Sequence, residues 1–270
     1  MKLTFLGTAA AEGFPAVFCN CEFCREARRE GGKSIRTRSQ ALVNSDLLID
    51  LPADTYYHFL NNGIVADGIK YLLITHPHSD HFYPDELEMR QPPFAHAMKS
   101  PRLTLVCAEK TAKLIKVNAQ TVDPCIIREY ETVVLGDYEI TALPARHMRA
   151  GDTPYIYIIK GEKTLLYAHD TGYLLDGVFE YIGKNGIRLD MISLDCTNVT
   201  LTIGDDGGHM GLENNVRVLE RLRSIGAVTE NTVAYVNHFS HNGNPLHSRL
   251  VPIAKELGFE VSYDGLTVEF

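Results

Sequence analysis

Short apolar segments of strand length recur along the whole chain, separated by polar residues and turn residues. They are rich in Ile, Val, Leu and Tyr, which favour the pleated, half-buried environment of a β-strand. The segments cover residues 3–6, 41–43, 47–51, 71–75, 103–107, 132–135, 138–143, 155–159, 164–168, 191–196, 232–236, 259–263 and 266–270. Some consecutive segments are separated only by short turn sequences, which predicts antiparallel hairpins. These turns lie at residues 44–46, 136–137, 161–162 and 264–265.

Three segments between the predicted strands have helical character. In the clearest one, apolar residues recur every three or four positions at Leu212, Val216, Leu219, Leu222 and Ile225. A second helix is predicted over residues 247–257, where Gly258 supplies a C-cap, and a short one over residues 24–30. No repeat or linker interrupts the pattern. Helices interspersed among hairpins therefore predict one α/β domain over residues 1–270, with helices covering sheets.

Composition narrows the classes of function. Of the 270 residues, 45% are hydrophobic and 22% are charged, which is typical of a globular protein rather than a disordered or fibrous one. No apolar segment approaches the ~20 residues of a membrane span, and the N-terminus lacks the features of a signal peptide. We therefore expect a cytoplasmic protein without membrane contacts. The formal net charge of −8 argues against nucleic acid as a partner, because phosphate backbones bind basic surfaces.

The densest chemical signal follows the apolar segment at residues 71–75. His76, His78, Asp80 and His81 lie so close together that packing is a poor explanation for them. Imidazole nitrogens and carboxylate oxygens are ligands for Zn, Mn or Fe. In extended backbone His76 and His78 point to the same side, and a following turn can aim Asp80 and His81 at a second ion. The motif predicts a metal site at the end of a strand.

This H-x-H-x-D-H motif after a buried strand resembles the signature of the metallo-β-lactamase-fold hydrolase superfamily. The resemblance implies a single-domain, four-layer αββα sandwich with a dinuclear metal centre at one edge. It also implies further ligands after later strands, and His147, Asp170 and His238 match them. The first ion is then held by His76, His78 and His147, and the second by Asp80, His81 and His238. Asp170 bridges the two ions, and Asp50 matches an outer carboxylate that orients a ligand.

A second metal-binding pattern lies near the N-terminus. Cys19, Cys21 and Cys24 form C-x-C-x-x-C, and three thiolates this close favour tetrahedral Zn. With His241 and a G-T-x-x-x-x-G-x-P segment at residues 7–15, the pattern resembles the branch of PhnP-type cyclic-phosphate phosphodiesterases of phosphonate breakdown. That resemblance implies a structural zinc held by the loop at residues 19–24 and by His241. The remaining cysteines, Cys107, Cys125 and Cys196, are expected to be buried small apolar residues.

The same resemblance implies hydrolysis of a small cyclic or nucleotide-like phosphodiester. Two divalent ions, Zn or Mn, activate a bridging hydroxide and offset the charge of the phosphoryl group. His209, within Gly207–Gly211, matches a histidine that protonates the leaving alkoxide. Asp80 is expected to orient the attacking water as well as to bind metal. Arg146 or Arg149 could contact the phosphate of the substrate. The resemblance also favours a homodimer.

Other functions on the same fold stay open at this point. A ribonuclease Z-like nuclease shares the metal ligands and the His209-type acid, although the negative charge disfavours it. A protein like those of pyrroloquinoline-quinone biosynthesis shares the cysteine pattern. A carbon-ester or lactone hydrolase needs a group that polarises a carbonyl rather than an acid like His209, and a non-catalytic sensor would be expected to lack metal ligands. His169, beside Asp170, is expected to point away from the metals.

Overall fold

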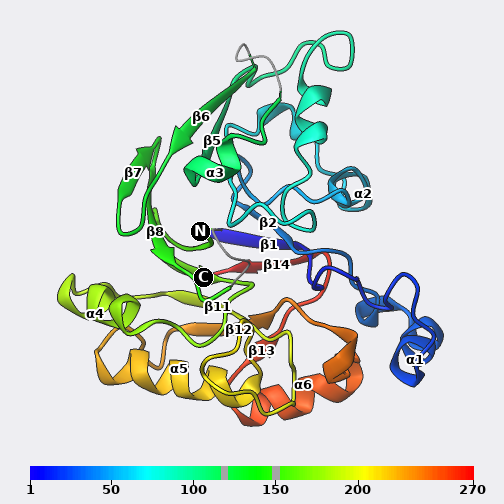
Figure 1. The fold of residues 1–270 in the computed structure, drawn as a ribbon, viewed down its shortest axis with the longest axis vertical. Helices are drawn as coiled ribbons and strands as arrows, with labels where there is room; N and C mark the ends of the chain where they lie inside the picture. The colour runs from blue at the N-terminus through cyan, green and yellow to red at the C-terminus, as the bar shows by residue number, and fades with distance from the viewer. Residues whose placement is uncertain (117–120, 148–152) are drawn as a thin grey trace.

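The computed structural model describes residues 1–116, 121–147 and 153–270. In this part of the chain two mixed sheets face each other (Figure 1). The first contains, in spatial order, β14 (Leu266–Glu269), β1 (Lys2–Gly7), β2 (Gln40–Val43), β3 (Leu47–Ile49), β4 (Tyr71–Leu73), β5 (Leu103–Cys107) and β6 (Val122–Ile126). The second contains β13 (Glu260–Val261), β12 (Val233–Asn237), β11 (Met191–Asp195), β10 (Thr164–Ala168), β9 (Tyr155–Lys160), β8 (Tyr138–Pro144) and β7 (Thr132–Leu135).

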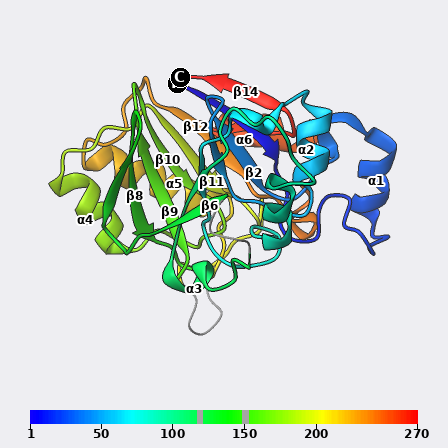
Figure 2. The same cartoon turned by 90° about the horizontal axis from the view of Figure 1, so that it is seen from above.

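Helices cover the outer face of each sheet. The α-helices are α1 (Glu22–Glu30), α2 (Thr55–Asn61), α3 (Glu109–Ala112), α4 (Asp176–Lys184), α5 (Leu212–Ser224) and α6 (His247–Glu256). Short 3-10 helices are η1 (Gly32–Ser34), η2 (Ala66–Gly68), η3 (Pro84–Arg90) and η4 (His241–Gly243). Figure 2 shows α1 at one end of the sandwich and α4 at the opposite end. None of the helices in the described ranges is long and apolar enough to cross a membrane.

Side chains alternate between the two faces of each strand, so the apolar residues form one core layer between the sheets and one between each sheet and its helices. Leu165 and Tyr167 of β10 point between the sheets, whereas Leu166 and Ala168 pack under α4, α5 and α6. On the first sheet the outer apolar residues pack against Phe59 of α2 and Ala112 of α3. The layers are therefore helix, sheet, sheet and helix, which confirms the predicted four-layer αββα sandwich.

Most predicted strands appear close to their expected positions, but β6 and the helices α2, α3 and α4 were not predicted, and one predicted hairpin is wrong. β6 was not predicted because Pro124 interrupts its sequence pattern, and a strand with proline is tolerated here because β6 lies at the edge of its sheet. Helix α4 was not predicted, because its two glycines, Gly177 and Gly183, weaken the helical pattern of the sequence. The predicted hairpin at residues 264–265 is wrong, since β13 pairs with β12 and β14 pairs with β1.

Parallel pairing brings the functional strand ends to one edge. β3 runs parallel to β4, and β10, β11 and β12 run parallel to one another. Their carboxyl ends therefore lie side by side within each sheet, where side chains beyond the strands can converge. Between the sheets, the hydroxyl of the buried Tyr157 donates to the carbonyl of Ile74 at 2.8 Å. This bond fixes the chain just before the histidine motif.

We expect Tyr157→Phe to lower the free energy of unfolding by about 1–2 kcal/mol, because the buried carbonyl of Ile74 loses its hydroxyl donor. Urea denaturation measures the change. Tyr56→Phe removes the same hydroxyl from a side chain that is 70% exposed on α2, and it should have no effect. Equal stability of the two variants would contradict the role given to the bond between the sheets.

Candidate metal centre

The edge where the two sheets meet collects the side chains of the histidine motif and of three later loops. His76, His78, Asp80 and His81 come from the segment between β4 and η3. His147 follows β8, Asp170 follows β10 and His238 directly follows β12. The structure thus brings together all seven residues that were predicted to hold the dinuclear centre.

The first group contains His76, His78, His147 and Asp170. The His78 Nδ1 atom lies 2.9 Å from His76 Nε2 and 3.0 Å from His147 Nε2. Asp170 Oδ2 lies 3.1 Å from His76 Nε2. Nitrogen ligands at ~2.0–2.1 Å around a tetrahedral zinc are about 3.3 Å apart, so these donor atoms have the spacing of a metal shell.

The second group contains Asp80, His81, Asp170 and His238. The His81 Nε2 atom lies 3.3 Å from His238 Nε2, 3.2 Å from Asp170 Oδ2 and 3.4 Å from Asp80 Oδ2. Asp170 belongs to both groups, as a bridging carboxylate must. The buried nitrogen and oxygen donors therefore fit two divalent ions that share Asp170.

Outer hydrogen bonds fix which nitrogen of His81 faces this centre. Its Nδ1 donates to Asp50 Oδ2 at 2.7 Å, and Asp50 is fully buried. The Thr75 backbone N–H and hydroxyl donate to Asp50 Oδ1 at 2.8 and 2.9 Å. Since Nδ1 carries the proton, Nε2 presents its lone pair to the ligand group. Asp50 thus lies where the sequence placed an outer carboxylate.

Asp195, at the end of β11, is a functional candidate that the sequence analysis missed. Its Oδ2 lies 3.3 Å from His238 Nδ1 and 3.5 Å from His209 Nδ1, and these three residues form a further group of possible ligands with Asp170. Yet its carboxylate already accepts from the Thr197 N–H, the Thr197 hydroxyl and the Met210 N–H. We therefore infer that Asp195 orients His238 and His209 rather than binding metal.

The electrostatics of the centre favour cations. Burial lowers the pKa of His147 to about 4, against the charge of Asp170, and lowers that of His76, so both rings are neutral and can bind metal. Burial opposes ionisation of Asp170, but the surrounding histidines hold its pKa well below the usual value. Burial also opposes the charge on His81, yet Asp50 and Asp170 raise its pKa well above normal. A metal ion at Nε2 satisfies the same negative potential as a proton.

Left-handed backbone aims three of these side chains. Asp50, Asp170 and His238 have φ values of 65°, 52° and 63°, and each follows the last residue of a strand or the residue after it. A non-glycine residue with left-handed backbone costs about 1–3 kcal/mol and persists where the surrounding structure fixes it. This backbone conformation turns each side chain away from the strand direction and into the site.

His209 lies beside the metal-ligand groups, in the loop before α5. Its ring centroid is 5.0 Å from that of His147 and 6.0 Å from that of His238. Its Nδ1 is 3.0 Å from Asp170 Oδ1, and a third of the side chain stays exposed. The ring lines a cavity of about 490 Å³, together with Asp80, Glu12, Asn198 and Asn242.

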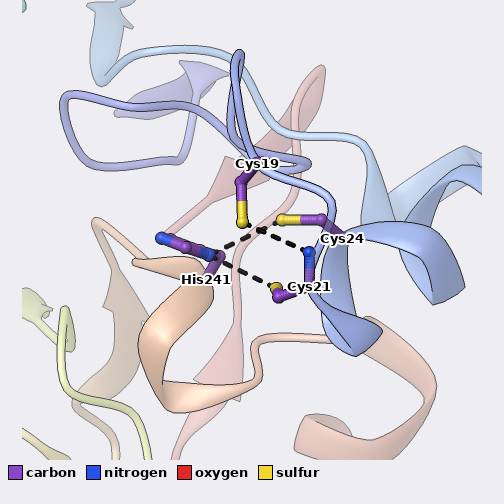
Figure 3. Close-up of side chains that lie close together, drawn as sticks. All are labelled: Cys19, Cys21, Cys24 and His241. Carbon is purple, nitrogen blue, oxygen red and sulfur yellow. Dashed lines mark hydrogen bonds between the residues drawn. The ribbon is translucent and has the colours of Figure 1, made fainter.

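The cysteine cluster forms a separate site at the N-terminal end of α1 (Figure 3). The side chains of Cys19, Cys21, Cys24 and His241 point toward one another. His241 Nδ1 lies 3.6 Å from both Cys21 Sγ and Cys24 Sγ, close to the ~3.6 Å edge of a tetrahedral zinc site with Zn–S of about 2.3 Å. The hydrogen bond from His241 lowers the pKa of Cys21 to about 6, whereas burial raises that of Cys24 to about 12. A cation bound there would displace the Cys24 proton.

Comparison with known proteins agrees with this geometry. The family model described as "Beta-lactamase superfamily domain" matches residues 54–239. The chain belongs to the beta-lactamase superfamily. No curated protein sequence gave a significant match. The superfamily is known for metal-dependent hydrolases, and the ligand groups described above agree with that class of enzyme.

Solved structures share the superfamily fold over nearly the whole chain. A diphosphatase from the PhnP family has a TM-score of 0.75 at 23% identity, covering 100% of this chain and 97% of its own. Zn²⁺-bound PqqB from Methylobacterium extorquens has a TM-score of 0.76 at 19% identity, with 100% of both chains covered. Human tRNase Z, short form, has a TM-score of 0.65 at 14% identity, covering 100% of this chain and 99% of its own.

The remaining predicted residues lie less directly on the centre. The Arg146 side chain donates through Nε to the carbonyl of Tyr173 at 3.2 Å, and Arg149 lies outside the described residues. Cys107 and Cys196 are buried as expected, and Cys125 is partly exposed. Asp195 was missed because a carboxylate at the end of an apolar strand forms no motif. Its position after Ser193 and Leu194, at a strand end like Asp50, was the available signal.

We expect Asp50→Asn to weaken metal binding about 10–100-fold, because the amide cannot accept from both His81 and Thr75 as the carboxylate does. Titration with Zn²⁺ or Mn²⁺ against a competing chelator measures the affinity. Asp54→Asn is the matched control, since Asp54 pairs with Arg38 at 3.1 Å and does not contact the centre. Unchanged affinity in Asp50→Asn would remove the outer role of this carboxylate.

Proposed function

We propose that the protein is a metal-dependent phosphodiesterase that acts on a small cyclic or nucleotide-like phosphodiester. The observation that carries the proposal is the place of His209 on the wall of the cavity, beside the two groups assigned to the ions and in neither of them. Phosphodiester hydrolysis needs a proton for the leaving alkoxide from a group that is not a metal ligand.

The residues of the centre define what the metals would supply. The two groups that share Asp170 would hold two ions, and their nitrogen and oxygen donors suit Zn or Mn. These ions would act as Lewis acids toward the phosphoryl oxygens and would lower the pKa of a bound water. Asp80 lines the cavity, and its Oδ2 lies 3.4 Å from His81 Nε2. It can therefore accept a hydrogen bond from the attacking water and orient it.

His209 is placed to hold and deliver a proton. Burial disfavours its charge, but the neighbouring carboxylates of Asp170 and Asp195 raise its pKa to about 10. Because Nδ1 faces these two carboxylates, Nε2 is the nitrogen that faces the cavity and the leaving group. A cation shared with Asp170 would lower the pKa from this value toward the ordinary one. His209 would remain a usable acid near neutral pH.

The cavity favours a small substrate. It is lined by Glu12, Asp80 and uncharged polar side chains such as Asn198 and Asn242. Together with the net charge of −8, this lining disfavours a long polyanion such as tRNA. Fold similarity to a PhnP-family diphosphatase supports chemistry at a phosphoryl group. Equal fold similarity to PqqB makes a role in cofactor biosynthesis the second candidate.

We expect His209→Ala to lose about 10²-fold or more in turnover of a 2′,3′-cyclic nucleotide, whose leaving group is an alkoxide. The loss on bis(p-nitrophenyl) phosphate should be smaller, because nitrophenolate leaves with little protonation. The reaction needs protonated His209, so the cyclic-nucleotide rate should fall as pH rises through its pKa, between about 6.5 and about 10. Steady-state kinetics across pH measure both effects.

The control for this experiment is His96→Ala, which removes an exposed histidine outside the centre and should change neither rate. Equal losses on both substrates in His209→Ala would contradict the acid role. No turnover of either substrate by wild-type protein with its metals bound would contradict the phosphodiesterase proposal and favour the PqqB-like alternative.

The cysteine site is proposed to hold a structural zinc. We expect Cys24→Ser to lose one equivalent of zinc and to lower the melting temperature by about 5 °C or more, since metal binding there stabilises the folded loop. Metal analysis and calorimetry measure these changes. Cys125→Ser, a partly exposed thiol outside the cluster, should keep its zinc. Full zinc content in Cys24→Ser would show that the cluster does not bind the ion.

A further inference from the structure

A chain of buried hydrogen bonds lies directly behind the metal centre. The Ser262 hydroxyl is 2.5 Å from Asn237 Oδ1, and Asn237 Nδ2 donates to His169 Nδ1 at 3.0 Å. His169 Nε2 then donates to the Ser193 hydroxyl at 2.7 Å. All four side chains are at most 1% exposed. His169 was expected to point away from the metals, and it belongs to none of the ligand groups described above.

The chain connects four neighbouring strands of the second sheet. Ser193 lies in β11 and Asn237 ends β12, while His169 and Ser262 directly follow β10 and β13. His169 precedes Asp170, and Asn237 precedes His238. Both of these ligands have left-handed backbone, at φ 52° and 63°. The hydrogen bond between His169 and Asn237 therefore joins the two residues from which the turns toward the metals begin.

Backbone in this region needs surroundings that leave it no alternative. A small rotation at His169 or Asn237 would swing the following ligand out of reach, because metal ligands require distances within a few tenths of an ångström. We propose that His169, through its hydrogen bond with Asn237, is a positioning residue that holds Asp170 and His238 in place for the metals. It contacts neither ion, and it acts on the backbone of their ligands.

The direction of each bond supports a positioning role over simple packing. Asn237 Nδ2 lies 3.0 Å from His169 Nδ1, and because an amide nitrogen can only donate, His169 Nδ1 accepts. The proton of His169 is thereby on Nε2, where Ser193 accepts it. Apolar side chains at these four positions would fill the same space without burying six polar atoms. The buried bonds fix one orientation of the ring, and thus one separation of β10 from β12 at the metal edge.

Substitutions of His169 can separate its two hydrogen bonds. His169→Asn places an oxygen near the Nδ1 position and can still accept a hydrogen bond from Asn237. His169→Gln places its amide near the Nε2 position and can form a hydrogen bond only with Ser193. His169→Leu loses both hydrogen bonds. Titration of the chelator-treated protein with Mn²⁺ measures affinity and stoichiometry, and the melting temperature measures stability. Mn²⁺ reports on the nitrogen and oxygen site because it disfavours thiolates.

We expect His169→Leu and His169→Gln to bind Mn²⁺ about 10–100-fold more weakly than wild type, and His169→Asn to bind it more tightly than either. Leu194→Ala is the matched control, because Leu194 lies on the same strand as Ser193 but packs toward the helices. It should lower the melting temperature without this loss of affinity.

Three results would overturn the proposal. One is wild-type Mn²⁺ affinity in His169→Leu, and another is an equal loss of affinity in Leu194→Ala. The third is equal affinity in His169→Asn and His169→Gln, a comparison that stays decisive if His169→Leu does not fold. Because the readout is metal binding, the test does not depend on the substrate proposed above.

Discussion

Three buried carboxylates, Asp50, Asp170 and Asp195, concentrate negative charge at one edge of the sandwich, and the site depends on how that charge is balanced. Each side chain is at most 3% exposed. A buried charge without compensation costs several kcal/mol, so each carboxylate needs donors or cations within reach. Asp50 and Asp195 receive backbone N–H groups and threonine hydroxyls. Asp170 is left facing the rings of His76, His81, His147 and His209. The difference assigns the roles: two carboxylates are satisfied by protein and orient histidines, and the third is available to bridge metals.

The same constraint explains the backbone around these groups. Each carboxylate or histidine on a left-handed residue lies beside a buried polar side chain that is itself hydrogen-bonded. In the first sheet Gln40 Nε2 donates to the carbonyl of Asp50 at 3.0 Å, and His58 Nδ1 lies 2.6 Å from Gln40 Oε1. In the second sheet Asn237 and His169 occupy the corresponding place behind His238 and Asp170. In both sheets, residues with left-handed backbone at the site thus lie next to buried hydrogen bonds, which is what a rigid, preorganised centre requires.

The sequence predicts the parts of this molecule that are local. The histidine motif is contiguous, and the strands before His147, Asp170 and His238 have clear apolar patterns, so resemblance could place every ligand that the structure brings together. The outer residues escape prediction because their partners are distant in sequence. Asp195 acquires a role only when His209 and His238 arrive beside it, and His169 only when Asn237 does. β6 and the false hairpin at residues 264–265 fail for a related reason, since sheet position rather than local pattern decides where Pro124 is tolerated and which strand β14 joins.

The N-terminal loop connects the cysteine site to the metal centre at the edge of the sheets. Phe239, between the ligand His238 and the cysteine partner His241, pairs with this loop, since its N–H donates to the Thr8 carbonyl and its carbonyl accepts from the Ala10 N–H. Ser240 donates to Glu12 Oε1 at 2.5 Å, and Glu12 lines the cavity. The segment 238–241 therefore supplies one ligand to the metal centre, His238, and one to the cysteine site, His241. A cation bound by Cys19, Cys21, Cys24 and His241 would fix the far end of the loop whose near end forms the cavity wall. Its effect on the reaction would come through the position of Glu12 and His238, since the cysteines do not line the cavity.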